Sequence, residues 1–233
     1  MQRTRSATSD RGSSKVIEVM EARQLLAGNV TAGIVGGILV VQGDNKSNAI
    51  VIQSFSDVTT KVIPAPGTTV NGNGAASFPG WPAITVDLGN GDDSVTFVDL
   101  AFQSVNVTTG NGNDRVIGAT DGFPPNVFGH LTIDTGNGDD YVHLGGNTGV
   151  AADMNIDTGN GADVVEVVDN TGVGGNINIE TGNGPDIVRL AGAFSIGGNL
   201  KVDGGRGPDI LDRGGAGFSI GGTVTFIDIE TLL

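Results

Sequence analysis

The chain has 233 residues, of which 40 are glycine and only 5% are aromatic, and its 26 acidic side chains outnumber 12 basic ones to give a formal net charge of −14. A surface of that charge repels nucleic acid and anionic lipid and attracts cations, so we expect no nucleic-acid partner and no membrane insertion. The absence of cysteine excludes disulfides and thiolate metal sites, and it leaves packing, backbone ladders and oxygen-ligated ions to stabilise a fold.

Residues 1–28 are predicted to form a flexible, polar N-terminal arm. The first 25 residues hold five of the twelve bases and are rich in serine. The first 24 residues contain no apolar run of about 7 to 15 residues, which an ordinary secretory signal needs. The next apolar stretch, residues 32–41, is interrupted by glycine, and we interpret it as a buried strand rather than a membrane span.

Residues 29–82 are predicted to be degenerate coils that cap a stack of repeats. Residues 38–52 contain two strands around a turn, with Asn48 at the place where the later repeats carry aspartate. Proline lacks the backbone donor of a strand ladder and is typical of a sheet edge. Four prolines interrupt this segment: Pro64, Pro66, Pro79 and Pro82.

Residues 83–213 contain six copies of one glycine- and aspartate-rich turn. Aligned on the second glycine, the copies recur about every 23 residues, with one slightly shorter and one slightly longer interval, and such a period is typical of stacked repeats. Short apolar runs of period two flank each turn, which indicates strands. The aligned glycines are Gly91, Gly112, Gly138, Gly161, Gly184 and Gly207.

A third short strand per repeat is visible in residues 193–198 and 217–222, which read AFSIGG and GFSIGG. Three strands in about 23 residues predict one coil of a parallel β-helix, an all-β solenoid with one Gly/Asp turn column. Six such coils, about 4.8 Å apart, rise roughly 30 Å. Residues 214–233 supply a C-terminal coil and cap.

Stacking in register would place the acids of the turns in two columns. Adjacent carboxylates about 4.8 Å apart repel, and a cation offsets that repulsion. The first column is Asp93, Asp114, Asp140, Asp163, Asp186 and Asp209; the second, upstream of the turns, is Asp87, Asp134, Asp157, Glu180 and Asp203.

Calcium is the cation that suits these turns, because it takes six to eight oxygens in a flexible geometry and a Gly-x-Gly turn exposes backbone carbonyls. We therefore predict Ca²⁺ sites at the two columns and the turn glycines, with the tightest near Asp93 and Asp140, where Asp92 and Asp139 add charge. The turn glycines are Gly89, Gly91, Gly110, Gly112, Gly136, Gly138, Gly159, Gly161, Gly182, Gly184, Gly205 and Gly207.

The turns resemble the G-G-x-G-x-D-x-U-x nonapeptide of repeats-in-toxin proteins, which implies Ca²⁺ between stacked coils. The match runs from Gly89 to Leu211. The first glycine of the nonapeptide is present only in the last copy, as Gly204, and other residues replace it elsewhere. Each coil holds a single nonapeptide, which supports at most one row of ions. The replacements are Leu88, Thr109, Thr135, Thr158 and Thr181.

A second resemblance lies in residues 19–28, VMEARQLLAG, which look like the N-terminal L-E-P-R-x-L-L motif of planctomycete surface and secreted proteins. Glu21, Arg23, Leu25 and Leu26 match, and Ala22 stands in place of proline. The resemblance implies a secreted or cell-surface location. A chance amphipathic turn is the alternative interpretation.

The turns can also be explained without metal. Asparagine and aspartate satisfy nearby backbone donors, and stacked asparagines form a hydrogen-bonded ladder that an ion can supplement but does not require. The asparagines are Asn90, Asn111, Asn137, Asn160 and Asn183.

The sequence favours a noncatalytic structural module, stiffened by Ca²⁺, that self-associates through its strand edges into filaments or surface layers. The first alternative is a β-helical polysaccharide-degrading enzyme, but candidate groups such as His143, Tyr141, Arg115 and Arg189 show no convergence, and His143 reads as a solvated strand residue. The second alternative is an adhesin or other binding module, for which the chain offers Trp81 but no aromatic stripe.

Overall fold

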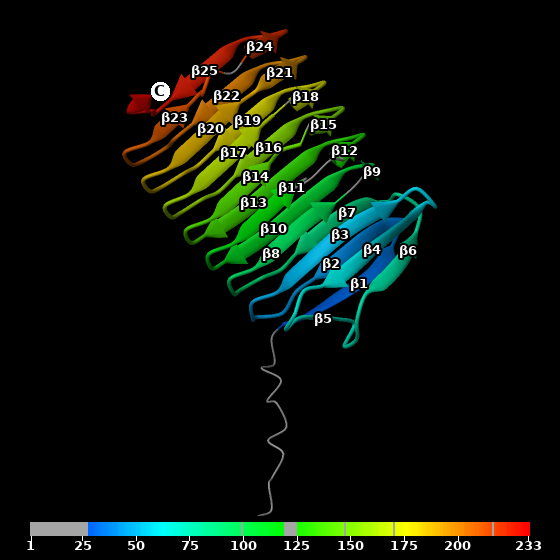
Figure 1. The fold of residues 1–233 in the computed structure, drawn as a ribbon. Helices are drawn as coiled ribbons and strands as arrows, with labels where there is room; N and C mark the ends of the chain where they lie inside the picture. The colour runs from blue at the N-terminus through cyan, green and yellow to red at the C-terminus, as the bar shows by residue number, and fades with distance from the viewer. Residues whose placement is uncertain (1–27, 99, 119–124, 147, 170, 216) are drawn as a thin grey trace, which may run out of the picture.

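The computed structural model describes residues 28–98, 100–118, 125–146, 148–169, 171–215 and 217–233. Within these ranges every regular element is a β-strand, and the strands form three sheets that wind as a solenoid (Figure 1). The predicted parallel β-helix, with about 23 residues per turn, is confirmed.

The first sheet has ten strands, each hydrogen-bonded to the next in the order given. They are β25 (Val224–Ile227), β22 (Leu200–Asp203), β19 (Ile177–Glu180), β16 (Met154–Asp157), β13 (Leu131–Asn137), β10 (Val105–Asn111), β7 (Ala83–Asp87), β2 (Ile38–Gln42), β1 (Asn29–Val35) and β5 (Thr69–Val70).

The second sheet also has ten strands and lies across the glycine turns from the first. They are β26 (Thr231–Leu232), β23 (Ile210–Asp212), β20 (Ile187–Ala191), β17 (Val164–Val168), β14 (Tyr141–Leu144), β11 (Arg115–Gly118), β8 (Ser94–Val98), β3 (Ala49–Phe55), β4 (Thr59–Pro64) and β6 (Ala76–Pro79).

The third sheet has six shorter strands and closes each coil. They are β24 (Gly217–Ile220), β21 (Ala193–Ile196), β18 (Thr171–Val173), β15 (Gly149–Val150), β12 (Pro125–Val127) and β9 (Leu100–Phe102).

Successive coils pair in parallel and in register, so that equivalent residues stack. In the first sheet Val107 pairs with Ile133, and Ile133 pairs with Ile156. Alternate residues point inward and are almost fully buried, which forms one continuous apolar core along the axis. The longer interval between the second and third turns is accommodated without loss of this register, because β11 and β14 still pair residue by residue from Arg115 with Tyr141.

The end that carries the N-terminal strands is built differently from the rest. Strands β2 and β3 pair in parallel with β7 and β8 and form a true coil around the turn that contains Asn48. The other strands of this end pair antiparallel: β1 with β2, β3 with β4, and β4 with β6. Residues 29–82 thus hold one coil covered by hairpins. The outermost strand of the second sheet, β6, ends in Pro79, which cannot donate to a further strand.

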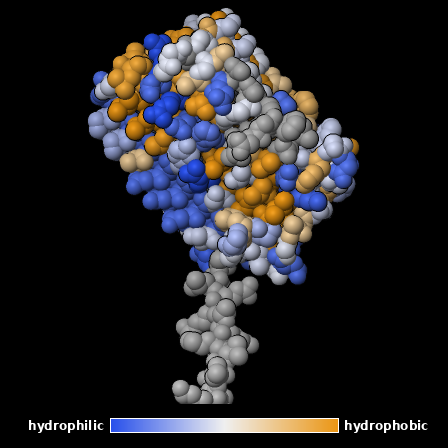
Figure 2. Space-filling view, viewed as in Figure 1, coloured by the Kyte–Doolittle hydropathy of each residue, from blue (hydrophilic) through white to orange (hydrophobic). Residues whose placement is uncertain are grey.

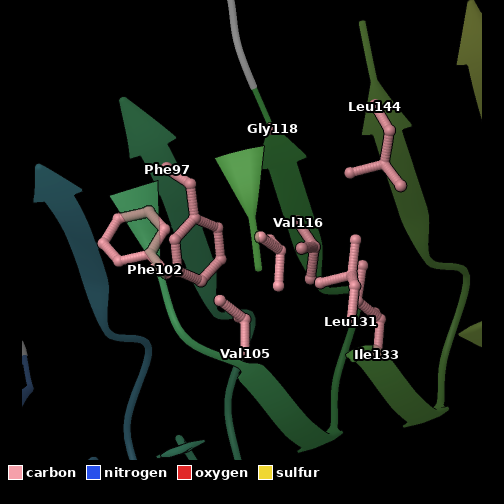
Figure 3. A pocket seen from close by; sticks show the side chains of 9 residues that line it. Phe97, Phe102, Val105, Val116, Gly118, Leu131, Ile133 and Leu144 are labelled. Atoms are coloured by element: carbon pink, nitrogen blue, oxygen red, sulfur yellow. The ribbon is translucent and has the colours of Figure 1, made fainter. Parts of the chain in front are cut away.

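A small apolar void lies in the interior near the start of the regular coils (Figure 3). Phe97, Phe102, Val116 and Leu144 line it together with Gly118. Gly118 pairs with Phe97 on one side and Leu144 on the other, so the glycine stands at an inward position that its neighbours fill with large side chains.

Candidate functional site: the glycine-turn corner

The corner between the first and second sheets carries the repeated turn, and its glycines are required by the backbone. Gly112 and Gly138 have φ of 134° and 133°, a region that side chains other than glycine rarely adopt. A Cβ added at Gly138 would lie 1.8 Å from the carbonyl oxygen of Gly112 in the neighbouring coil. The glycines therefore allow successive turns to stack at the strand spacing.

The repeated aspartates turn inward and are between 0% and 2% exposed. In each, Oδ1 accepts the backbone N–H of the equivalent residue one coil closer to the N terminus. The donors from Asn48 to Asp186 lie 2.6 to 2.9 Å from these oxygens, and at the other end of the column Glu230 Oε2 accepts the N–H of Asp209 at 2.7 Å. The column therefore links one coil to the next from Asn48 to Glu230.

The second oxygen of each carboxyl in the column, Oδ2, is buried and has no hydrogen-bond partner. Burial is the main cause that raises the pKa of these groups, to about 7 for Asp93 and Asp163 and to about 6 for Asp140. Burial also raises the pKa of Asp114 and Asp186. In each carboxyl of the column, Oδ1 thus accepts a backbone N–H, and Oδ2 is removed from water without a hydrogen bond.

Threonine fills the inner side of four of the turns. These residues are fully buried, and each hydroxyl donates to a carbonyl of the next coil, as Thr109 Oγ1 does to Thr135 O at 3.3 Å. Burial raises the pKa of Asp114, and the Thr109 hydroxyl offsets part of that rise, so it lies close to the carboxyl. The equivalent donors are Thr135, Thr158 and Thr181.

The last turn differs, because Gly204 stands where the others carry threonine or leucine. A Cβ at Gly204 would lie 2.8 Å from Asp209 Oδ2 and 2.3 Å from Asp228 O. The first position of the turn therefore points at the buried carboxyl. A side chain at Gly204 would therefore have to displace Asp209 or Asp228, whereas the other turns accommodate threonine or leucine at this position.

The asparagine ladder that the sequence predicts without metal is present. Each side-chain Nδ2 donates to the Oδ1 of the preceding asparagine at 2.7 to 2.8 Å, beginning at Asn45. A further ladder, which the sequence reasoning did not find, runs beside it: Asp92 Oδ1 accepts the N–H of Asn113, and Asp139 Oδ1 accepts that of Ala162. Asp92 and Asp139, predicted to strengthen calcium sites, thus already hold backbone donors.

The second predicted column lies apart from the first. Asp87, Asp134 and Asp157 are exposed, whereas the repeated aspartates are buried. Burial raises the pKa of Asp157, with smaller contributions from the charges of Asp134 and Glu180. Among the described residues no group of three or more histidine, aspartate or glutamate side chains is placed to hold a metal ion. The inward direction of the repeated aspartates could have been predicted from the sequence. Each stands two residues before an inward valine or leucine, and residues two apart in a strand face the same side.

A second polar network, on the outer face of the second sheet, was also missed. Glu166 Oε2 accepts the Tyr141 hydroxyl at 2.6 Å and lies 3.1 Å from His143 Nδ1. Glu166 Oε1 accepts Arg189 Nη1 at 2.6 Å, and Arg189 Nε donates to Asp212 at 3.1 Å. These bonds lower the pKa of Glu166. His143, Glu166, Arg189 and Asp212 therefore form a row of polar contacts with one member per coil.

Comparison with known proteins gives no match to a family model, to a curated protein or to a solved structure. The described part of the chain contains no helix that could span a membrane.

Proposed function

We propose that this protein is a noncatalytic structural module, a rigid acidic β-solenoid that works at the bacterial cell surface or outside the cell. The observation that carries the proposal is the use of the corner side chains. The repeated aspartates, asparagines and threonines bind the neighbouring coil rather than converge on a cleft. Groups that could serve catalysis on the outer face, such as Glu166 and Arg189, likewise pair from coil to coil. Side chains that bind the neighbouring coil stiffen the solenoid, and this use favours a structural role over catalysis.

Export is supported by the net charge of −14, which suits a solenoid that remains soluble in a salt-rich medium, and by the motif in residues 19–28. All of that motif except Gly28 lies outside the described residues.

Incubation with acidic polysaccharides tests the noncatalytic role. We expect no release of reducing ends above that of a heat-unfolded sample. Steady release that is lost in Glu166→Gln would overturn the structural role and favour the polysaccharide-degrading enzyme.

Calcium binding is part of the proposal, and the geometry of the turns narrows where it would occur. In the four threonine turns a side chain fills the space beside the aspartate, and in the first turn Leu88 is fully buried. The last turn differs because further acids adjoin the column there. Burial raises the pKa of Asp209, the charges of Glu230 and Asp228 add to that rise, and Glu230 Oε2 accepts the N–H of Asp209. These oxygens suit Ca²⁺. We therefore propose Asp209 as the favoured site, in place of Asp93 and Asp140, where the sequence predicts the tightest binding.

Thermal unfolding with millimolar Ca²⁺ and with chelator tests this site. We expect Ca²⁺ to raise the melting temperature of the wild-type chain, because an ion that binds only the folded state stabilises it by mass action. Asp209→Asn keeps an acceptor for the N–H of Asp186 but removes the charge, so it should abolish the calcium response.

Asp140→Asn is the matched control, in a turn that threonine fills, and it should retain the response. An unchanged melting temperature in the wild type removes calcium from the proposal but leaves the structural role intact. Equal loss in both variants would argue for a row of ions along the column instead.

A further inference from the structure

Among the residues that the structure describes, none covers the apolar interior at the end formed by β24, β25 and β26. Val224 stacks on Leu200 and Leu232 on Leu211, whose side chains are 1% and 0% exposed, yet Val224 and Leu232 are 48% and 52% exposed. Phe218, Ile220 and Phe226 stack in the same way and are only partly buried. Figure 2 shows hydrophobic residues at the upper left, toward this end, and a further hydrophobic area at the lower right, toward the N-terminal strands. We call the five residues Phe218, Ile220, Val224, Phe226 and Leu232 the open end.

The same five residues carry backbone groups without a partner strand. Thr223 O, just before β25, accepts the N–H of Leu200, and Ile227 O accepts the N–H of Gly204. The intervening Val224 and Phe226 therefore direct their N–H and C=O groups to the free edge. The bonds of Thr231 and Leu233 to β23 leave Leu232 facing outward in β26. At β24, Gly217 and Gly221 donate to the preceding coil, so the backbone groups of Phe218 and Ile220 also face outward. An edge that is both apolar and unpaired is a template for another strand.

The opposite end does not offer a matching surface. It is covered by the antiparallel hairpins, and its outer strands are the two-residue β5 and the proline-ended β6. Head-to-tail stacking of copies would need a parallel three-edged coil there, and the hairpins occupy that place. The surface complementary to an open end is therefore another open end.

We propose that the open end joins the open end of a second copy, forming a tail-to-tail dimer. A two-fold axis across the solenoid reverses the direction in which the chain winds, so each edge strand meets an antiparallel partner. The contact is isologous and closes at two copies. This dimer rests on the structural role proposed above and gives the solenoid a second copy of itself as its partner. It takes the place of the filaments or surface layers that the sequence favours.

Charge and area agree with this partner. Near this end the chain carries one base, Arg213, whose guanidinium lies over the ring of Phe226, and two exposed acids, Asp228 and Glu230. A two-fold contact uses the same surface twice, so the base of each copy can meet the acids of the other. A coil with four-residue strands has a cross-section on the order of 500 Å², so a dimer buries roughly 1,000 Å² in total, which is the lower limit for a specific interface. An interface at this lower limit is typical of reversible association, so monomer and dimer should exchange.

Sedimentation velocity of the full chain from low to high micromolar concentration, in chelator, tests the dimer. We expect a reversible monomer–dimer equilibrium. Leu232→Lys places a charge in the contact, and Val224→Pro removes an outward N–H that the solenoid itself does not use. Each should weaken the dimer by at least about tenfold.

Val35→Lys is the matched control, because it replaces an apolar residue that is 65% exposed at the other end. It should leave association unchanged. A wild-type chain that stays monomeric at every concentration overturns the dimer, and the open end must then have another occupant. Open-ended growth, or association lost only in Val35→Lys, also overturns it. Melting temperatures measured on the same samples show whether the solenoid remains folded, so failure of the dimer is distinguishable from failure of the structural role.

Discussion

At the scale of single residues, burial decides what the repeated aspartates do. Asp163 is 0% exposed, its Oδ1 holds a backbone N–H, and desolvation raises its pKa to about 7. An aspartate in the unfolded chain titrates near 3.8. The folded chain therefore binds more protons than the unfolded chain between these two values.

The consequence is a pH dependence of stability with a definite sign. The contribution of Asp163 is fully present below about pH 4 and is lost as the pH rises through about 7. The free energy of unfolding from urea denaturation should fall between pH 5 and pH 8. Asp163→Asn keeps an acceptor for the N–H of Asp140 and carries no charge, so at pH 8 it should be more stable than the wild type by on the order of 2 kcal/mol.

The exposed Asp134→Asn is the control, since its carboxyl lies on the surface, and it should keep the wild-type slope. A steeper fall in Asp163→Asn than in the wild type would contradict the assignment of the slope to the buried column.

At the scale of elements, glycine has two different roles. Gly138 lies in a turn whose φ of 133° and close approach to Gly112 O leave no room for a side chain. Gly118 lies in strand β11, faces the interior and borders the apolar void. The first glycine is needed by the backbone, and the second leaves space unfilled.

Gly118→Ala should therefore stabilise the chain by about 1 kcal/mol, through a buried methyl group and a less flexible unfolded state. Gly138→Ala should destabilise it by at least about 2 kcal/mol, because both φ and the neighbouring carbonyl oppose a Cβ. Chemical denaturation of the two variants gives the comparison. Destabilisation by Gly118→Ala would show that the void is already closed by its neighbours.

At the scale of the whole molecule, each coil contacts mainly the coils beside it, so stability should decrease from the middle toward the open end. The C-terminal coil is bonded on one side only, whereas the coil of β16 is bonded on both sides. The end coil should open locally before the rest.

Native-state hydrogen exchange at low protein concentration checks this gradient. The amide of Thr225 in β25 should exchange faster than that of Asn155, which holds the same place in β16. Equal rates for the two amides would mean that the solenoid opens only as one cooperative unit.

Much of the fold could be predicted because a solenoid repeats local information. The nearly constant repeat period, the alternation of apolar residues and the turn glycines together determine three strands per coil, the stacking register and the inward face. The asparagine ladder follows from the same register, since equivalent side chains lie one strand spacing apart.

Tertiary structure alone decided what each carboxyl contacts and how the stack ends. A single repeat does not tell whether the oxygen beside Asp140 belongs to an ion, a threonine or a backbone amide of the next coil, because that neighbour lies a full coil away along the chain. The hairpins over β2 and β3 were equally hidden, since an antiparallel and a parallel strand share the same alternation. Sequence periodicity determined the coil, and contacts between coils determined its chemistry and its two unlike ends.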